Sequence, residues 1–420
     1  MKFTKKYNLK NFSLVCLILF FGIVGNAFAE KINVKNFGAK GDGKNDDTLA
    51  IQSTVNAIPD SGGTVFFPPG KYKISKTINI NRSNLFFVGS GVTKSTILFN
   101  RVAQMVVVQP LAKIPISNFL FKGIRYVNSG KTLAKPGKMS GYGRAAIHLD
   151  PYFAKISKVI ITENFIDGGP TVGIGVSGED ITVIKNKIVA TDQHGIYLSV
   201  GRNIRIVDND LSGIGLKSPI GSQSAIKISH GHKVFVGKNR IKNLGHEISG
   251  INAESTSSNV SINDNSISLS DRNQVGLRIH AEKVTALGNR IDGGNGYQNS
   301  FAIDVKDGTG ASFTDTKVIG SWKSSAVSVR NGVSDVLFDR LEILKGSKRS
   351  WAIDLRNSIR PTIQNSSILS GSLGISLGKT DGARITNTQI FVTDERYGLG
   401  KKPTNCVIME NGRNICQTLR

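Results

Sequence analysis

Cysteine and histidine are scarce in this sequence, which has three cysteines and six histidines among 420 residues. Cys16 lies in an apolar N-terminal segment, so only Cys406 and Cys416 remain in the rest of the chain. They lie close together in a chain that we expect to enter an oxidising compartment, so we predict one disulfide there. No histidines cluster around them, and no zinc or other metal site is predicted.

The N-terminal apolar run, residues 12–24, is too short for a membrane anchor, because a bilayer span needs roughly 20 apolar residues. Four lysines and no acidic residue precede this run, and the small residues Ala27 and Ala29 follow it. This pattern is typical of a signal peptide, residues 1–29, with cleavage after Ala29. We therefore expect a secreted or periplasmic protein with no membrane association after cleavage.

Acidic residues are few relative to basic ones, and the formal net charge is +24. Loss of the four signal-peptide lysines would leave +20. Such an excess indicates an anionic partner: nucleic acid, a membrane surface or an acidic polysaccharide. Export favours the polysaccharide, and aromatic residues do not accompany the cations in the pairs typical of nucleic-acid binding. A cationic surface that serves only solubility is the alternative.

Helix-length amphipathic runs are absent, and a short strand-like phrase recurs instead. The phrase is Ala or Gly, an aliphatic residue, any residue and a second aliphatic residue. It occurs ten times between residues 146 and 377, at intervals of 22 to 30 residues. The first aliphatic residues of the ten copies are Ile147, Ile174, Ile196, Ile226, Ile251, Leu277, Ile303, Val327, Ile353 and Ile375. One such unit cannot bury its apolar face, but stacked units can share a continuous core.

A second phrase follows each strand-like copy by about a dozen residues and carries asparagine. Stacked asparagines can hydrogen-bond to one another from coil to coil. We therefore expect one polar ladder, which continues with Thr316, Asp339, Ser366 and Thr388 in the later coils. Its asparagines are Asn164, Asn186, Asn209, Asn239, Asn265 and Asn289.

The segment before the coils carries FGAKGDGKNDDTLAIQ, a helix expected from Asp47 to about Ala57, and GGTVFFPPGKY. This combination resembles the N-terminal cap of the pectate-lyase-like (pectin lyase-like) β-helix superfamily, which includes polysaccharide lyases, polygalacturonases, rhamnogalacturonases, uronan epimerases and phage depolymerases. The resemblance and the repeat predict an all-β, single-domain right-handed parallel β-helix of about eleven or more coils, rather than a sandwich or propeller. We expect a cap and first coils over 30–90, the β-helix over 91–392 and a C-terminal cap over 393–420.

Alternation along each repeated strand points the residues one and three places after the first aliphatic residue outward. Stacking the coils turns these residues into a basic, partly aromatic strip that fits an acidic polysaccharide. Its predicted substrate-binding residues are His194, Glu254, Lys306, Arg330, Asp354 and Arg356. A solvated face of paired charges is the alternative.

β-Elimination is the reaction that the residue types of this outward strip suit best. Arg278 would neutralise the uronate carboxylate, Lys227 or His280 would remove the C5 proton, and Tyr197 would protonate the leaving oxygen. Lyases of the superfamily use these residue types in such roles. The predicted catalytic residues are thus Tyr197, Lys227, Arg278 and His280, with Asp304 as the candidate of the hydrolytic alternative.

Three other functions stay open at this point. Hydrolysis needs two carboxyl groups, for which Asp304 and Asp354 are two coils apart, near the upper limit for an inverting enzyme. Epimerisation at C5 is suggested by His148, Asp150 and Tyr152 in IHLDPY, which resembles a phrase of uronan epimerases. A non-catalytic glycan-binding β-helix is the third. No cofactor is required, although Glu254, Asp304 and Asp354 could offer oxygen ligands to calcium.

Overall fold

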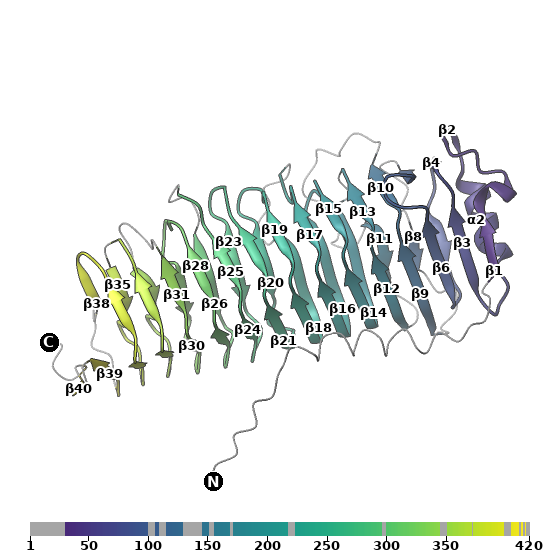
Figure 1. The fold of residues 1–420 in the computed structure, drawn as a ribbon. Helices are drawn as coiled ribbons and strands as arrows, with labels where there is room; N and C mark the ends of the chain where they lie inside the picture. The colour runs from purple at the N-terminus through teal and green to yellow at the C-terminus, as the bar shows by residue number, and fades with distance from the viewer. Residues whose placement is uncertain are drawn as a thin grey trace, which may run out of the picture.

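The computed structural model describes residues 30–99, 106–108, 115–128, 145–150, 155–168, 171–216, 223–295, 300–344, 351–371, 373–398, 405–410, 413–414 and 416. The predicted signal peptide, Tyr152 and most of the turn after Asn128 lie outside these residues. The described chain winds into one elongated solenoid of parallel strands, with both caps at opposite ends (Figure 1). The predicted all-β parallel β-helix is confirmed.

Each coil contributes a strand to each of three faces, which we call the first, second and third face. The first face carries the repeated phrase. Its strands, in stacking order, are β5 (Ile78–Ile80), β8 (Val106–Val108), β11 (Ala145–Leu149), β14 (Val172–Ile184), β16 (His194–Val207), β18 (Ser224–Gly237), β20 (Ser249–Ala253), β23 (Val275–Ile279), β26 (Phe301–Lys306), β29 (Val327–Arg330), β32 (Trp351–Asp354), β35 (Leu373–Ser376) and β38 (Glu395–Gly398).

The second face follows the first along the chain. In β14, β16 and β18 the two faces form one continuous strand, whereas other coils break between them. The remaining strands of the second face are β1 (Glu30–Asn33), β3 (Gly63–Phe67), β6 (Leu85–Gly89), β9 (Ile116–Lys122), β12 (Ile156–Thr162), β21 (Ser258–Asn263), β24 (Thr285–Leu287), β27 (Ser312–Thr314), β30 (Leu337–Asp339), β33 (Thr362–Gln364), β36 (Arg384–Thr386) and β39 (Val407–Glu410), which also pairs with β40 (Arg413–Asn414).

The third face is a separate sheet of 14 strands in the described residues, one strand per coil, in agreement with the expected number of coils. These strands are β2 (Asp42–Asp46), β4 (Gly70–Ile74), β7 (Ser95–Phe99), β10 (Arg125–Asn128), β13 (Phe165–Asp167), β15 (Lys187–Val189), β17 (Asp210–Ser212), β19 (Arg240–Lys242), β22 (Ser266–Ser268), β25 (Arg290–Asp292), β28 (Lys317–Ile319), β31 (Glu342–Leu344), β34 (Ser367–Leu369) and β37 (Gln389–Phe391).

The core is one column of inward side chains enclosed by the three faces. The first aliphatic residues of all ten repeated phrases are fully buried, as their position in the phrase predicts. Aromatic rings stack where they enter this column, as in Phe313 on Phe338, with ring centroids 5.1 Å apart. Apolar burial along the whole column stabilises the stack, because no single coil can exclude water from its own face.

The asparagine ladder is confirmed and lies between the second and third faces. Its predicted continuation is wrong at Asp339, which ends β30; Leu341 takes the ladder position in that coil, and its N–H donates to Ser366 Oγ at 3.0 Å. Asn209 Nδ2 donates to the carbonyl of Val183 and to Oδ1 of Asn239, each at 3.0 Å. Asn209 Oδ1 in turn accepts from the backbone N–H of Asn186 at 3.0 Å. The residue before each ladder asparagine adopts a left-handed conformation, for example Lys185 with φ of 56° and Asp208 with φ of 55°. The ladder supplies hydrogen-bond partners to backbone N–H and C=O groups at this turn. The turn needs a left-handed residue, a conformation that is unfavourable for residues other than glycine.

The N-terminal end is closed by the 3-10 helix η2 (Val34–Phe37) and by α2 (Thr48–Ala57), close to the helix expected from the sequence. The Asp47 carboxylate accepts from the backbone N–H groups of Lys40 and Gly41 at 2.6 and 3.1 Å, which fixes the Gly-Asp-Gly loop. Ile51 and Val55 of α2 are buried against the first coils. The helix therefore covers a core that would otherwise face water.

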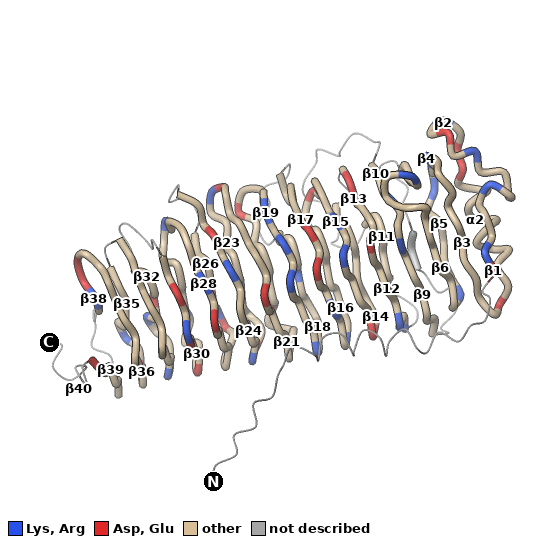
Figure 2. Tube along the Cα trace, viewed as in Figure 1, with Lys and Arg blue, Asp and Glu red and all other residues tan. Residues whose placement is uncertain are grey.

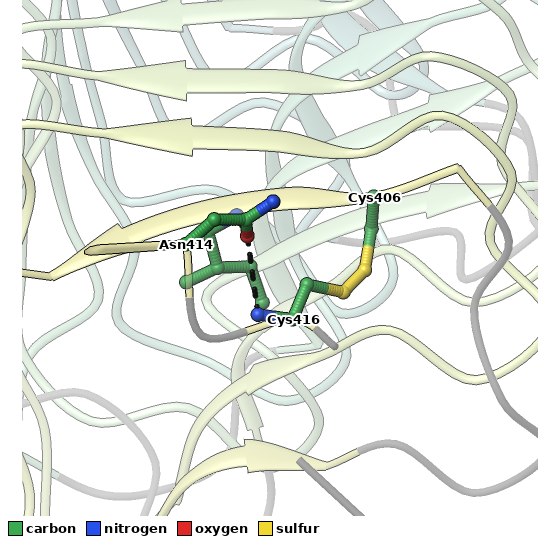
Figure 3. Close-up of a disulfide and its surroundings, with 4 residues drawn as sticks. Cys406, Asn414 and Cys416 are labelled. Carbon is green, nitrogen blue, oxygen red and sulfur yellow. Dashed lines mark hydrogen bonds between the residues drawn. A yellow bond between two sulfur atoms is a disulfide. The ribbon is translucent and has the colours of Figure 1, made fainter. Parts of the chain in front are cut away.

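The C-terminal cap brings the two remaining cysteines together (Figure 3). Cys406 and Cys416 have Cα atoms 6.0 Å apart, a separation that fits a disulfide. Asn414 Oδ1 accepts from the N–H groups of Ile408 and Cys416 at 3.0 and 3.2 Å and closes the loop between them. Among the described residues, none of the helices is long and apolar enough to cross a membrane.

Candidate functional site

The outward column predicted one place after the first aliphatic residue is confirmed by the strand register. Each of its members pairs with the next one in the adjacent coil. In stacking order they are His148, Gly175, Tyr197, Lys227, Asn252, Arg278, Asp304, Ser328, Asp354 and Ser376. We call these positions the rungs of the first face; adjacent rungs are about 4.8 Å apart.

The residues three places after the first aliphatic residue were predicted to form a second outward column. The pairing within that column differs from the prediction between Ser177 and Ser199. A register shift follows Val176, so that Ser177 pairs with Val200 and not with Ser199. An extra residue in one strand of a pair bends the strand and redirects nearby side chains. Here the bulge lies beside a pocket, and both Ser177 and Ser199 line it.

The pocket lies over Gly175, between the side chains of His148 and Tyr197. Ala145, Val172, Val176 and the two serines complete the lining of this shallow, partly open depression. A Cβ atom at Gly175 would come within 2.8 Å of His148 Cδ2 and 3.5 Å of His148 Nε2. This edge of the imidazole therefore lies beside the space that Gly175 leaves open. His148 and Tyr197 stand two rungs apart with a gap between them.

His148 has the chemistry of a proton acceptor at this position. The residue is 8% exposed, and its Nδ1 has no hydrogen-bond partner within the described residues. Burial lowers the pKa of His148 below the ordinary 6.5, and the charge of Asp150 opposes this shift only in part. The imidazole is therefore neutral at neutral pH, the form that can accept a proton.

Tyr197 is held from two sides. Its ring stacks on His194 with centroids 5.2 Å apart, and its hydroxyl lies 3.4 Å from Ser229 Oγ. The Ser229 hydroxyl donates to Glu254 Oε2 at 3.0 Å, and Lys227 Nζ lies 2.8 Å from Glu254 Oε1. This network holds the phenol hydroxyl beside β18 and ties it to the next two coils.

His194 is a support for Tyr197 rather than the substrate-binding residue that was expected. The backbone N–H of Ser224 donates to its Nδ1 at 3.1 Å. Burial, with a smaller contribution from the charge of Lys227, lowers the pKa of His194 to about 4. A neutral, buried ring packs under the phenol without adding charge.

Lys227 is not placed as a base, because it forms an ion pair with Glu254. Burial would raise the pKa of the Glu254 carboxyl, but the hydrogen bond and charge of Lys227, with Ser229 and His280, outweigh it and lower that pKa. Lys227 therefore supplies positive charge beside Tyr197, and the predicted substrate-binding residue Glu254 positions it.

Arg278 lies two rungs beyond Lys227, with the buried Asn252 between them. Desolvation by burial lowers the pKa of Arg278, although the guanidinium stays charged at any physiological pH. Asp304 on the next rung is already held by Arg330 through contacts of 2.6 and 2.7 Å. Arg278 is thus a cation in a poorly hydrated position on the predicted strip.

The carboxylates proposed for hydrolysis are each paired with an arginine. Arg330 holds Asp304, and Arg356 holds Asp354 through contacts of 2.8 and 2.7 Å. Asp304 and Asp354 lie two rungs apart as expected, and each would have to leave its arginine to act on a glycosidic bond.

Two other predicted residues lie farther along the strip. His280 Nδ1 is 3.6 Å from Asp307 Oδ2, away from the pocket residues. Lys306 pairs in register with Arg330 on the next coil, and no ion pair joins it to any described carboxylate. Acidic and basic residues are interspersed along the solenoid (Figure 2), so the strip mixes paired charges with a few unpaired cations.

The carboxylates suggested for calcium do not form a site together. Glu254, Asp304 and Asp354 lie on separate coils, and each faces its own cationic partner. No group of three or more histidine, cysteine or acidic side chains suited to a metal ion exists in the described part of the chain. These residues therefore do not fit a calcium ion.

Aromatic rings do accompany cations, contrary to the sequence-based expectation. Arg205 lies 4.9 Å from the ring centre of Phe235, and Arg330 lies 5.0 Å from that of Phe301. Cation–aromatic pairs on strands arise between coils, so they are invisible in the linear sequence. The absence of nucleic-acid binding stays a prediction without this support.

The sequence reasoning named Tyr197 and Lys227 but underrated His148 and missed Gly175. His148 entered only through the IHLDPY phrase, and Gly175 was one member of an outward column. The signal was present in the register, because a glycine on the rung between His148 and Tyr197 lets the imidazole lie over the strand.

Comparison with known proteins gives a consistent family. Residues 31–296 match the model of the family described as rhamnogalacturonase A/epimerase, pectate lyase-like. "Alginate lyase 7" of Azotobacter vinelandii is 46% identical over 72 residues, which are 16% of this chain and 8% of that protein. Mannuronan C5-epimerase AlgE2 of the same organism is 26% identical over 249 residues, 49% of this chain and 24% of that protein. The chain therefore spans less than a quarter of the length of these two relatives.

The solved structure of the AlgE4 A-module, a mannuronan C-5 epimerase module of Azotobacter vinelandii, has the same fold. It superposes with a TM-score of 0.60 at 15% identity, over 91% of this chain and all of that module. The superfamily suggested by the cap motif is confirmed, and the family match covers the cap, the pocket and the strip as far as Arg278. The chain belongs to the rhamnogalacturonase A/epimerase, pectate lyase-like family.

Proposed function

We propose that this protein removes the C5 proton from uronate residues of an anionic polysaccharide, with β-elimination as the outcome. The observation that carries the proposal is the gap over Gly175, which is flanked by the neutral His148 and by Tyr197. A sugar ring in this gap would have a proton acceptor on one side and a hydroxyl donor on the other. His148, rather than Lys227 or His280, is then the base.

The reaction follows from these positions. His148 accepts the C5 proton, and the electrons of that C–H bond form the C4–C5 double bond as the C4–O bond breaks. The Tyr197 hydroxyl donates a proton to the departing oxygen. Lys227 Nζ lies 6.0 Å from the centre of the Tyr197 ring, so its positive charge favours the phenolate that forms when Tyr197 gives up its proton.

C5 epimerisation is the second candidate, and one observation favours it. His148 and Tyr197 lie on opposite sides of the gap, so a proton taken from one face of C5 can be replaced on the other. The similarity over 249 residues to a mannuronan C5-epimerase supports the same chemistry. The two reactions share the first step and differ only in where Tyr197 delivers its proton.

Three readouts on one set of reactions separate the possibilities. Polymannuronate, alginate, polygalacturonate and hyaluronan are incubated with the protein in D₂O. Elimination produces an ultraviolet-absorbing unsaturated end and shorter chains. Epimerisation produces deuterium at C5 without shortening, and hydrolysis produces shortening without absorbance. Shortening without absorbance, or unchanged polymers on every substrate, would refute the proposal.

Variants connect the activity to the pocket. His148→Gln and Tyr197→Phe are each expected to lower kcat at least about a hundredfold, the usual contribution of a general acid or base. His232→Gln is the matched control, because His232 lies on the second-face half of β18 and hydrogen-bonds to Ser258. Equal losses in all three variants would mean that the pocket is not the active site.

We also propose that the protein is exported. The sequence pattern before Glu30 supports this, and Glu30 itself begins β1, whose pairing with β3 starts at this residue. The mass of the protein recovered from the periplasm or medium of its host tests the expected start at Glu30.

A further inference from the structure

Two rung positions of the first face, Lys227 and Arg278, are cationic, and one uncharged rung separates them. Lys227, Asn252 and Arg278 pair in consecutive register on β18, β20 and β23. Strand spacing places Lys227 and Arg278 about 9.6 Å apart along the solenoid axis, twice the 4.8 Å between neighbouring strands. The repeat of the fold thus fixes a two-rung spacing of positive charge next to the proposed pocket.

Arg278 differs from the other arginines of the strip. Arg330 and Arg356 each hold an aspartate at two points, whereas no described carboxylate forms an ion pair with Arg278. Its guanidinium is nevertheless largely shielded from water. The charges of Asp304 and Glu247 act on this guanidinium from beyond ion-pair distance, so a bound anion would give it the direct partner that it lacks.

The two-rung spacing matches a specific polymer geometry. A flat 1,4-linked uronan advances by about one strand spacing per sugar, and successive sugars turn opposite edges toward a surface. Carboxylates on one edge therefore recur at every second sugar. With one such carboxylate at Lys227, the next one on the same edge reaches Arg278.

We propose that Arg278 forms a second carboxylate subsite, which selects uninterrupted, flat 1,4-linked uronans by binding the sugar two residues beyond the one whose carboxylate lies at Lys227. This inference rests on the proposed function for the position of the reacting sugar. Arg278 is then a residue of specificity and not of the proton transfers. The planar guanidinium suits the role, because it binds a carboxylate at two points.

Binding of β-1,4-linked oligomannuronates of two to five sugars tests the proposal by titration calorimetry. The measurements use the His148→Gln background to slow turnover, and the oligomer lengths after each titration show whether the ligand stayed intact, so that a failure of the proposed reaction is seen separately. Arg278→Gln is expected to weaken binding of the three-sugar and longer oligomers on the order of tenfold, with less than a twofold effect on the disaccharide. Arg278→Lys should recover part of the loss.

Two controls make the outcome decisive. Arg205→Gln removes a cation of β16 on the second face and should leave every affinity unchanged within twofold. Asn252→Asp places a carboxylate between the two cations and should weaken the longer oligomers as Arg278→Gln does. An equal loss at all lengths, an equal loss in Arg205→Gln, or no loss in Arg278→Gln would overturn the proposal. Circular dichroism spectra of each variant confirm that it is folded.

Discussion

At the scale of the residue, the buried position of His148 sets the pH range in which the proposed reaction can proceed. The neutral imidazole is the active form, so kcat/KM should fall as pH drops through the pKa of His148. Burial lowers that pKa below 6.5, so the acidic limb should lie below the range of an ordinary histidine. A pH profile of kcat/KM measures the limb. A limb at or above pH 6.5 would exclude His148 as the base.

Gly175 makes a second prediction at this scale. A methyl group there would lie 2.8 Å from His148 Cδ2, so Gly175→Ala should displace the imidazole and fill the gap. We expect kcat/KM to fall at least about tenfold and the unfolding free energy to fall by roughly 1 to 3 kcal/mol, because Gly175 is buried and the added methyl group overpacks the site. Urea unfolding and initial rates on the same preparations measure both effects. Ser328→Ala, at an outward rung far from the pocket, is the control.

At the scale of the element, the asparagine ladder holds the corner between the second and third faces. Asn209→Ala removes acceptors and donors from Asn186, Asn239 and the Val183 carbonyl at once. We expect a loss of about 3 kcal/mol in unfolding free energy, since buried partners are left without hydrogen bonds. Urea unfolding measures it, and Ser266→Ala, at an exposed position beside Asn265, should change little. A loss within 0.5 kcal/mol would mean that the ladder is not stabilising.

The continuous strands β14, β16 and β18 are the elements that present the pocket and its support. Because they run through from the first face to the second, Tyr197 and Lys227 stand on strands anchored on both sides. The register shift after Val176 adds Ser199 beside the pocket without breaking the strand. Rigid strands position proton-transfer groups better than loops do.

At the scale of the whole molecule, stability is divided among coils that contact only their neighbours, so each end depends on its cap. We predict that Cys406 and Cys416 form a disulfide that secures the C-terminal cap. Reduction should increase amide hydrogen exchange in β36 to β39 and leave β14 to β18 unchanged, because the cap and the pocket are many coils apart. Exchange mass spectrometry with and without reductant measures this. A thiol titration that finds two free cysteines in the oxidised protein would contradict it.

The sequence alone determined the architecture, because the fold repeats and each coil carries the same strand-like phrase of alternating apolar residues. Ile174 and Ile196 share a position in the phrase and therefore a position in the core, and the same logic placed Tyr197 beside Lys227 and Arg278. Period-two alternation decides which side chains face outward, and this needs no long-range information. The cap helix and the asparagine ladder followed from local motifs in the same way.

Only the tertiary structure decided which of the outward residues can act. Lys227 was expected to be a base, but Glu254 lies one coil later and forms an ion pair with it. Asp304 and Asp354 were candidates for hydrolysis until Arg330 and Arg356 proved to hold them. The protonation state of a side chain depends on burial and on charges a few ångströms away, and these neighbours come from other coils. The linear sequence gives the row of side chains, and the stacking gives each of them its partner.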